Sequence, residues 1–332
     1  MKHGANIYKY AKEIGCDAKE VIDFSSNINL YQPKTTLDPD NEMIVKYADT
    51  SYMDLRKSIA KNYPVKKSQI ALYNGATSAI FDLLNTLDLD KVYLYAPLYG
   101  EYENALPKHV NKIKINRFKN INLIPQKNST VVFVNPSTPD GKYYDLKKLF
   151  KIWKKQNCQV ILDESFLEFE TLKSFVHEIN NYQKLYIIQS FSKFYACAGV
   201  RIGAVFSHKK NLKKLKQPIW NISSFDASFL TQRLNDKAFV KHSKKYHSLQ
   251  KKELKNILES SNLFSKIHQS DSNFFLVKTK HAKALFTHLL DYKILVRTCG
   301  SFDFLSNKYL RFAIKDKQSH TLLKKALKEF HE

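Results

Sequence analysis

Short apolar runs alternate with helical patterns along the first two thirds of the chain. Runs rich in β-branched and aromatic residues are typical of strands, whereas apolar residues three or four positions apart are typical of amphipathic helices. Helical patterns occupy residues 49–62, 77–87 and 146–155. Strand patterns occupy residues 70–73, 91–95, 112–116, 130–134, 159–163, 185–189 and 202–206. We therefore predict an α/β fold with a mostly parallel, seven-stranded sheet that is flanked by helices.

The pattern changes after about residue 236. A long, basic helical pattern reaches residue 260, and shorter alternating runs follow at 273–277, 294–297 and 310–314. A lysine-rich amphipathic helix is predicted from about residue 318. These elements predict a second, smaller α+β unit, and no flexible linker separates it from the first.

The composition is typical of a soluble globular protein. Of 332 residues, 43% are apolar and 26% are charged, which is too apolar for a disordered chain. No apolar run approaches the roughly 18–20 residues that span a bilayer, and the first twenty residues lack the apolar core of a signal peptide. The four cysteines form no C-x-x-C pair or Cys/His cluster. We therefore predict no metal site, no disulfide framework, and a location in the reducing cytoplasm.

A strong positive charge leaves a nucleic-acid-binding function open. Lysine and arginine number 54 against 31 aspartates and glutamates, a formal net charge of +23. Clustered cations bind phosphate backbones by releasing counterions. The lysines are dispersed, however, and the densest stretches, at 209–216 and 241–255, alternate with apolar residues as solvated helix faces do. A basic nucleic-acid-binding protein is therefore kept only as a distant alternative.

A lysine after a predicted strand is the first candidate for chemistry. The sequence has no G-x-x-x-x-G-K-[ST], G-x-G-x-x-G, G-x-S-x-G or H-E-x-x-H signature. It does have S-F-S-K directly after the strand pattern at 185–189. A lysine at the mouth of a sheet is poorly solvated, which lowers its pKa and frees the amine of Lys193 for Schiff-base chemistry. Ser190, Ser192 and Arg201 lie near it in the sequence and could hold a phosphate.

Three other polar segments follow predicted strands. Asp163 ends an apolar strand, where a carboxylate is costly unless it faces a cation. N-G-A-T at 74–77 joins a strand to a helix, with Thr77 as the expected N-cap and free N–H groups for an anion. N-P-S-T-P-D-G at 135–141 is a polar turn after another strand. In an open α/β sheet such carboxyl-terminal strand ends converge on one crevice.

These segments resemble, in order and over nearly the whole chain, the class I/II aminotransferases, which are fold-type I pyridoxal-phosphate (PLP) enzymes. S-F-S-K followed by G-x-R-x-G is the most specific of the matching motifs. The resemblance implies a PLP-dependent enzyme. It also implies a large PLP-binding domain at 48–235 and a small domain formed by both termini, 1–47 and 236–332.

The resemblance assigns a role to each matching residue. Lys193 would form the Schiff base with PLP and then shuttle the proton, and Asp163 would pair with the pyridinium nitrogen. Asn135 would hydrogen-bond the 3-oxygen of the ring, and Tyr102 would stack on the ring. Four residues would hold the cofactor phosphate: Ala76, Thr77, Ser190 and Arg201.

Two further residues bear on the partner and the substrate. Tyr47, in K-Y-A-D, would reach the phosphate of the neighbouring subunit's cofactor, which implies a homodimer. Arg311, in Y-L-R-F, matches the family arginine that clamps the substrate carboxylate bidentately.

Within this family the nearest likeness is to threonine-phosphate decarboxylases, and histidinol-phosphate aminotransferases come next. Three segments resemble decarboxylase motifs: H-G-A-N-I-Y from residue 3, D-F-S-S-N-I-N from residue 23 and V-R-T-C from residue 296. They contribute His3, Asn29 and Arg297 as expected substrate-binding residues. In both groups an arginine at the position of Arg297 helps to bind a substrate phosphate.

The sequence departs from the family pattern at several positions. Ala5, Leu30 and Thr298 replace the residues that are usual in the decarboxylase motifs. Phe166 stands where many aminotransferases have a tyrosine that donates to the 3-oxygen of the ring, so that hydrogen bond cannot form. The decarboxylase-like sequences also have phenylalanine there. We therefore predict decarboxylation of O-phospho-L-threonine or O-phospho-L-serine, with transamination of histidinol phosphate or another amino acid as the alternative.

Overall fold

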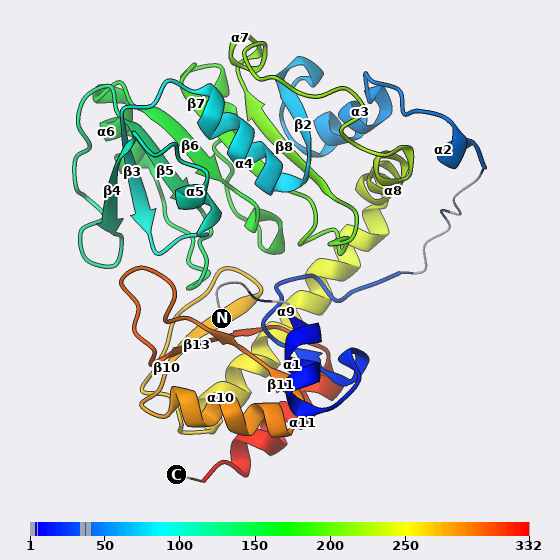
Figure 1. Cartoon of the computed structure of the whole chain (residues 1–332), viewed down its shortest axis with the longest axis vertical. Coiled ribbons are helices and arrows are strands. Elements are labelled where there is room, and N and C mark those ends of the chain that lie inside the picture. The colour runs from blue at the N-terminus through cyan, green and yellow to red at the C-terminus, as the bar shows by residue number, and fades with distance from the viewer. Residues whose placement is uncertain (1–3, 5, 34–36, 38–40, 332) are drawn as a thin grey trace.

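The computed structural model describes residues 4, 6–33, 37 and 41–331. Its main feature is a seven-stranded sheet in the order β2-β8-β7-β6-β5-β3-β4 (Figure 1). The strands are β2 (Ile70–Asn74), β3 (Lys91–Ala96), β4 (Asn111–Asn116), β5 (Thr130–Val134), β6 (Gln159–Asp163), β7 (Leu185–Ser190) and β8 (Ile202–Ser207). Only β8 runs antiparallel to its neighbours, and the other pairs are parallel. The predicted α/β fold with a mostly parallel, seven-stranded sheet is confirmed.

Both faces of this sheet are buried, which explains why its strands are almost continuously apolar. Along β5, Val131 and Phe133 belong to one hydrophobic core, and Val132 and Val134 belong to the core on the other face. The helices of this part are α3 (Met53–Asn62), α4 (Gly75–Thr86), α5 (Glu101–Asn104), α6 (Lys147–Lys155), α7 (Lys209–Leu212) and α8 (Ser224–Asn235). Short 3₁₀ helices are η2 (Lys67–Gln69), η3 (Leu167–Phe169) and η4 (Val176–Ile179), and α2 (Asn41–Val45) lies at the edge.

A smaller body is built from both ends of the chain. It contains a four-stranded antiparallel sheet in the order β12-β13-β10-β9, and a parallel pair of β1 with β11. Its strands are β1 (Ile22–Asp23), β9 (Lys266–Ile267), β10 (Phe274–Lys278), β11 (Ile294–Leu295), β12 (Arg297–Thr298) and β13 (Tyr309–Ala313). Its helices are α1 (Ile7–Ile14), η1 (Ala18–Glu20), α10 (Ala282–Asp291) and α11 (Lys317–Lys328). The division at residues 48 and 235 itself stays a prediction.

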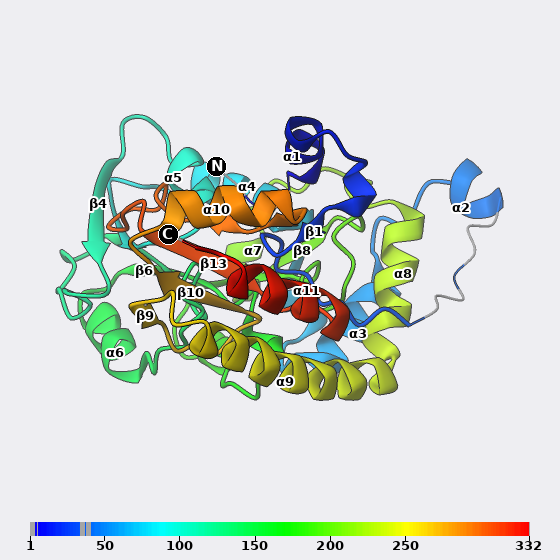
Figure 2. The ribbon, with the colours of Figure 1, turned by 90° about the horizontal axis from the view of Figure 1, so that it is seen from below.

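One long helix joins the two bodies. α9 (Lys237–Ser260) starts beside α8 and runs along the smaller body next to α11 (Figures 1 and 2). Phe239, near its start, packs in a core of the large sheet, whereas Leu254 and Leu258 pack in the core of the small body. The predicted helix at 236–260 is therefore present, and it is shared between the two cores.

Some elements differ from the sequence prediction. α4 begins at Gly75, so Thr77 lies inside the first turn and is not the N-cap. A φ of +79° at Gly75 lets β2 turn directly into the helix, which only glycine does without strain. The single strand predicted at 294–297 is two strands, because β11 pairs with β1 and β12 pairs with β13. Among the described residues, no helix combines the length and apolar character needed to cross a bilayer.

Candidate active site

The predicted site residues of the large sheet gather at one edge. Asp163 and Ser190 are the last residues of the parallel strands β6 and β7, and Asn135 directly follows β5. Because β8 is antiparallel to β7, Arg201, which precedes β8, lies at the same edge. These residues thus lie at the carboxyl ends of the parallel strands, which is the edge where α/β proteins bind their ligands.

Lys193 lies in the turn after β7 with its amine held near the sheet. Its Nζ donates to Ser190 Oγ at 3.0 Å, and Ser190 Oγ is 2.9 Å from Ser192 Oγ. Burial lowers the pKa of Lys193, Asp163 opposes this shift by favouring the charged amine, and Arg201 adds to it. The Phe166 ring centre lies 5.7 Å from Nζ. The amine is therefore less basic than that of an exposed lysine, as Schiff-base chemistry requires.

Asp163 is buried and held by two donors. Its Oδ2 accepts from the Tyr102 hydroxyl at 2.6 Å, and its Oδ1 accepts from the main-chain N–H of Ser165 at 2.9 Å. Burial and the adjacent carboxylate raise the pKa of Tyr102 well above its usual value, so the phenol keeps its proton. Tyr102 is fully buried. Its role in stacking on the ring stays a prediction, and its contact with Asp163 was not anticipated.

The start of α4 and Arg201 form a close-packed cradle. A Cβ on Gly75 would lie 2.7 Å from Arg201 Nη2, and one on Gly203 would lie 2.4 Å from the main-chain N of Ala76. Gly203 is thus required by close approach of the main chain, and Gly75 by its positive φ. No side chain caps this helix end, since the N-cap Asn74 makes no side-chain hydrogen bond. Main-chain N–H groups at an uncapped helix start and a guanidinium suit a phosphate.

Thr77 lies on the first turn of α4, and its Oγ1 is 3.5 Å from the hydroxyl of Tyr99. Tyr99 follows β3, so this contact joins the ends of two strands at the same edge. Ala76, Thr77, Ser190 and Arg201 therefore lie around one edge of the sheet, as the sequence predicts.

Asn135 closes the turn after β5. Its Nδ2 donates to the carbonyl of Tyr144 at 3.0 Å, and its Oδ1 accepts from the N–H of the same residue at 2.8 Å. Because an amide Nδ2 carries two hydrogens, this contact leaves one for another acceptor, and the hydrogen bond to the 3-oxygen of the ring stays a prediction. Thr138 in the same turn contacts Arg311, whose Nη1 donates to Thr138 Oγ1 at 2.8 Å.

Asn29 holds the turn that carries Lys193. Its Nδ2 donates to the carbonyl of Phe194 at 2.8 Å and to Ser243 Oγ at 2.9 Å, and its N–H donates to the carbonyl of Lys193. The side chain therefore fixes the Lys193 turn against α9, and its contact with a substrate stays a prediction. The other N-terminal prediction, His3, lies outside the described residues.

Two arginines face each other on the small sheet. Arg297 in β12 and Arg311 in β13 are direct partners in the antiparallel register, and both are buried. Arg297 Nη2 donates to Ser301 Oγ at 3.2 Å. Like charges opposite each other in a sheet repel, and burial lowers the pKa of both arginines.

Arg311 reaches between the two bodies. Its Nη2 donates to the carbonyl of Ser25 at 2.7 Å, while its Nη1 bonds Thr138 of the large sheet. Its Nε has no hydrogen-bond partner, and no carboxylate of the described residues pairs with it. Burial lowers the pKa of Arg311 to about 10, so it remains charged at neutral pH. A buried cation without a carboxylate partner is typical of a site that binds an anion.

Tyr47 lies on an exposed apolar surface. It is 80% exposed and stacks on Trp220 with ring centres 4.4 Å apart. We call the exposed apolar residues around it the α2–Trp220 surface: Ile44, Val45, Tyr47, Ile219 and Trp220. Within one chain Tyr47 is thus not part of the site.

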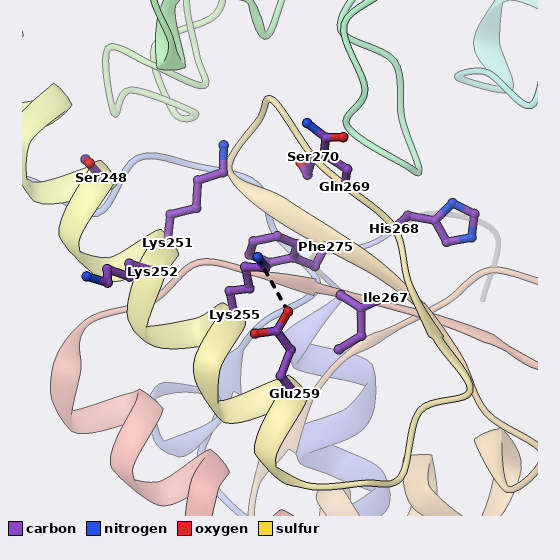
Figure 3. A pocket seen from close by; sticks show the side chains of 10 residues that line it. All are labelled: Ser248, Lys251, Lys252, Lys255, Glu259, Ile267, His268, Gln269, Ser270 and Phe275. Carbon is purple, nitrogen blue, oxygen red and sulfur yellow. Dashed lines mark ion pairs between the residues drawn. The ribbon is translucent and has the colours of Figure 1, made fainter.

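A separate pocket of about 540 Å³ lies between α9 and the segment around β9 (Figure 3). Lys251, Lys252 and Lys255 line it from α9, and Lys255 pairs with Glu259 at 3.4 Å. None of the residues expected in the active site lines this pocket.

Comparison with known proteins decides the family. The family described as aminotransferase class I and II matches residues 19–329. The chain belongs to this family. It is therefore an enzyme of a PLP-dependent family that includes aminotransferases and a decarboxylase. The residues that were predicted to hold the cofactor lie at the large sheet, and Arg297 and Arg311 lie on the small one.

Three relatives illustrate the range of this family. The adenosylcobalamin biosynthesis bifunctional protein CobDQ of Leptospira interrogans is 30% identical over 95% of this chain, which spans 39% of that relative. The threonine-phosphate decarboxylase of Salmonella typhimurium is 24% identical, over 98% of this chain and 95% of the relative. The crystal structure of the histidinol-phosphate aminotransferase from Clostridium acetobutylicum is 30% identical and has a TM-score of 0.81, over 92% of this chain and 97% of that one.

The residues fit the PLP of this aminotransferase family. A lysine of lowered basicity, a buried carboxylate, and a cradle of helix N–H groups with a guanidinium stand at one sheet edge. Thr138, Ser25 and Tyr99 were not predicted as site residues. Thr138 lies within the polar turn at 135–141 and Ser25 within D-F-S-S-N-I-N from residue 23, so part of the signal was present in the sequence.

Proposed function

We propose that this enzyme acts on a small phosphorylated amino acid, and that its reaction is decarboxylation of O-phospho-L-threonine or O-phospho-L-serine. The main support is the pair of buried arginines on β12 and β13, which lie opposite each other. A substrate with two anionic groups would neutralise both: its carboxylate would bind Arg311, and its phosphate would lie towards Arg297. A cytoplasmic location is part of the same proposal.

Each residue has a defined task in this proposal. PLP, when bound, supplies an electron sink for cleavage of a bond at the substrate Cα. Gly75–Thr77, Ser190 and Arg201 hold its phosphate, and Asp163 holds a proton at the pyridine nitrogen. Lys193, with its lowered pKa, would donate the proton that Cα takes up after the carboxylate has left as carbon dioxide; in transamination it would instead accept the proton from Cα. Arg311 and Arg297 orient the substrate. Their positions decide whether the bond from Cα to the carboxylate or the bond from Cα to hydrogen is perpendicular to the ring, and the group on that bond leaves.

A single mixing experiment tests the reaction. Cofactor-loaded enzyme is mixed with excess O-phospho-L-serine or O-phospho-L-threonine and no oxo-acid acceptor. Decarboxylation is expected to release carbon dioxide continuously while the cofactor's visible absorbance band persists. Transamination would instead convert the cofactor to its pyridoxamine form after one equivalent and then stop, which would contradict the proposed reaction.

Transamination of histidinol phosphate is the second candidate. It is supported by the 30% identity to the Clostridium acetobutylicum enzyme over most of both chains. Histidinol phosphate carries a phosphate but no carboxylate, so its phosphate would bind Arg297. Arg311 would then bind the second substrate, a dicarboxylic oxo-acid acceptor. If only histidinol phosphate with 2-oxoglutarate as acceptor gives turnover, this candidate replaces the first. We assign no role to nucleic acid.

We further propose that the α2–Trp220 surface forms a homodimer that brings Tyr47 to the cofactor phosphate of the neighbouring subunit. Its five apolar side chains are exposed in one chain, and an exposed apolar cluster of this kind is typical of an interface. The Tyr47–Trp220 stack would present both rings to the partner.

Replacing Trp220 with glutamate should convert the dimer to a monomer, because it places a charge in the apolar contact. Sedimentation velocity at low micromolar concentration measures the change.

Tyr47→Phe should keep the dimer but weaken PLP binding about tenfold, since it removes one hydrogen bond to a charged group. Leu249→Glu, at another exposed apolar position on α9, is the control and should change neither property. A wild-type monomer would contradict the proposed interface.

A further inference from the structure

Arg117 and Asp140 form a fully buried ion pair beside the candidate site. Arg117 directly follows β4, and Asp140 lies in the turn after β5. Their contact is bidentate, with Nη2–Oδ1 at 2.7 Å and Nη1–Oδ2 at 2.9 Å. The side chains are 0% and 2% exposed. A buried pair of this kind is weak support for stability, because the desolvation of both charges offsets their attraction. Stability alone therefore does not explain why the Arg117–Asp140 pair is buried at this position.

The remaining donors of Arg117 connect two segments that lead into the site. Nε donates to the carbonyl of Pro97, just before Tyr99, at 3.0 Å, and Nη2 donates to the carbonyl of Thr138 at 3.4 Å. Nη1 also donates to the hydroxyl of Tyr144 at 3.3 Å. Arg117 thus fixes the turn at 135–141 against the end of β3.

This turn has few main-chain bonds of its own. Pro136 and Pro139 have no N–H to donate, and the main-chain bonds that close it run from Gly141 to Ser137 at 2.6 Å and from Ser137 to Lys142 at 3.4 Å. Side-chain contacts must therefore fix the position of Thr138, which lies between the two prolines.

Thr138 is hydrogen-bonded to both Arg117 and Arg311. Its carbonyl accepts from Arg117, and its hydroxyl accepts from Arg311 Nη1 at 2.8 Å. Among the described residues, the guanidinium of Arg311 otherwise bonds only the carbonyl of Ser25, so Thr138 sets the direction of one side of the guanidinium. We propose that Arg117 and Asp140 are a positioning pair, which holds Thr138 where it aims Arg311 at the substrate carboxylate. This role rests on the function proposed above.

The test compares two ligands that differ only in the carboxylate, O-phospho-L-serine and O-phosphoethanolamine. Their dissociation constants are measured from the change in cofactor absorbance on rapid mixing. The variant is Arg117→Met with Asp140→Leu, which leaves no unpaired buried charge, so the fold is expected to persist. The preference for O-phospho-L-serine should fall about tenfold, with the affinity for PLP and Tm unchanged. Lys154→Met with Glu178→Leu, which removes a less buried pair at 3.5 Å, should keep the preference.

Two results would overturn the positioning role. One is a folded variant that keeps the wild-type preference to within about twofold. The other is a parallel loss of PLP affinity, ligand affinity and Tm, which indicates a purely structural pair. If the wild-type enzyme binds neither ligand, the proposed function fails instead, and a crystal structure of the double variant decides the positioning role alone. The hydrogen bond from Arg311 to Thr138 should then be absent, and its retention would refute the role.

Discussion

Replacing Lys193 with alanine should lower turnover by at least about a thousandfold, because both the Schiff-base amine and the proton carrier are lost. The cofactor should still bind through the Gly75–Thr77 cradle and Arg201, since neither depends on the amine. Borohydride reduction followed by peptide mass spectrometry measures the attachment. The wild-type protein should carry the pyridoxyl group on the peptide that contains Lys193, and the variant should carry none.

Lys210→Ala is the matched control, because Lys210 is exposed on α7 and outside the crevice. It should retain full turnover and the labelled Lys193 peptide. Labelling of a different lysine in the wild-type protein, or turnover that survives in Lys193→Ala, would contradict the assignment of the reactive amine.

Replacing Arg311 with methionine should reduce kcat/KM for an amino acid by about 10²–10⁴-fold, mostly through KM. Two hydrogen bonds between a guanidinium and a carboxylate are lost, at about 1.5–3 kcal/mol each, and each 1.4 kcal/mol is about tenfold. The thermal stability of the variant should not decrease with its activity. Arg311 is a buried cation with no carboxylate partner among the described residues, so methionine removes a desolvation penalty and Tm should stay constant or rise.

The control for this variant is Lys308→Met, at an exposed cation just before β13. It should leave KM and Tm unchanged. A second comparison uses O-phosphoethanolamine, which has no carboxylate: its binding should be nearly insensitive to Arg311→Met. If both ligands weaken equally, or if Tm falls together with activity, Arg311 does not bind the carboxylate.

The large sheet could be predicted from sequence because its strands are buried on both faces. Such strands are nearly continuous in apolar residues, and the seven predicted runs agree with β2–β8 to within one residue at either end. Asp163 and Lys193 could be placed at one edge for the same reason, since each closely follows an unambiguous strand. The small body was harder, because β1, β9, β11 and β12 have two residues each and no detectable period.

The contacts that Asn135 and Asn29 make within the fold could not be predicted from local pattern. Asn135 and Thr138 are both polar residues in one turn, and only the folded turn decides that the main chain of Tyr144 captures Asn135. Asn29 bonds Ser243, 214 residues away, and no short-range pattern contains that contact. Arg117 and Asp140 were overlooked because a charged residue at the end of a strand is usually solvated.

The pairing of β1 with β11 also has a consequence for the order of events during synthesis. Ile22 is paired with Ile294, so β1 cannot form its pair until β11, 272 residues further along the chain, has been synthesised. At about 5–20 residues per second this delay lasts about 15–50 s. All seven strands of the large sheet are translated within that interval, which allows them to assemble first. The segment that contains β1 is therefore without its strand partner while the large sheet forms, and its own domain is completed last.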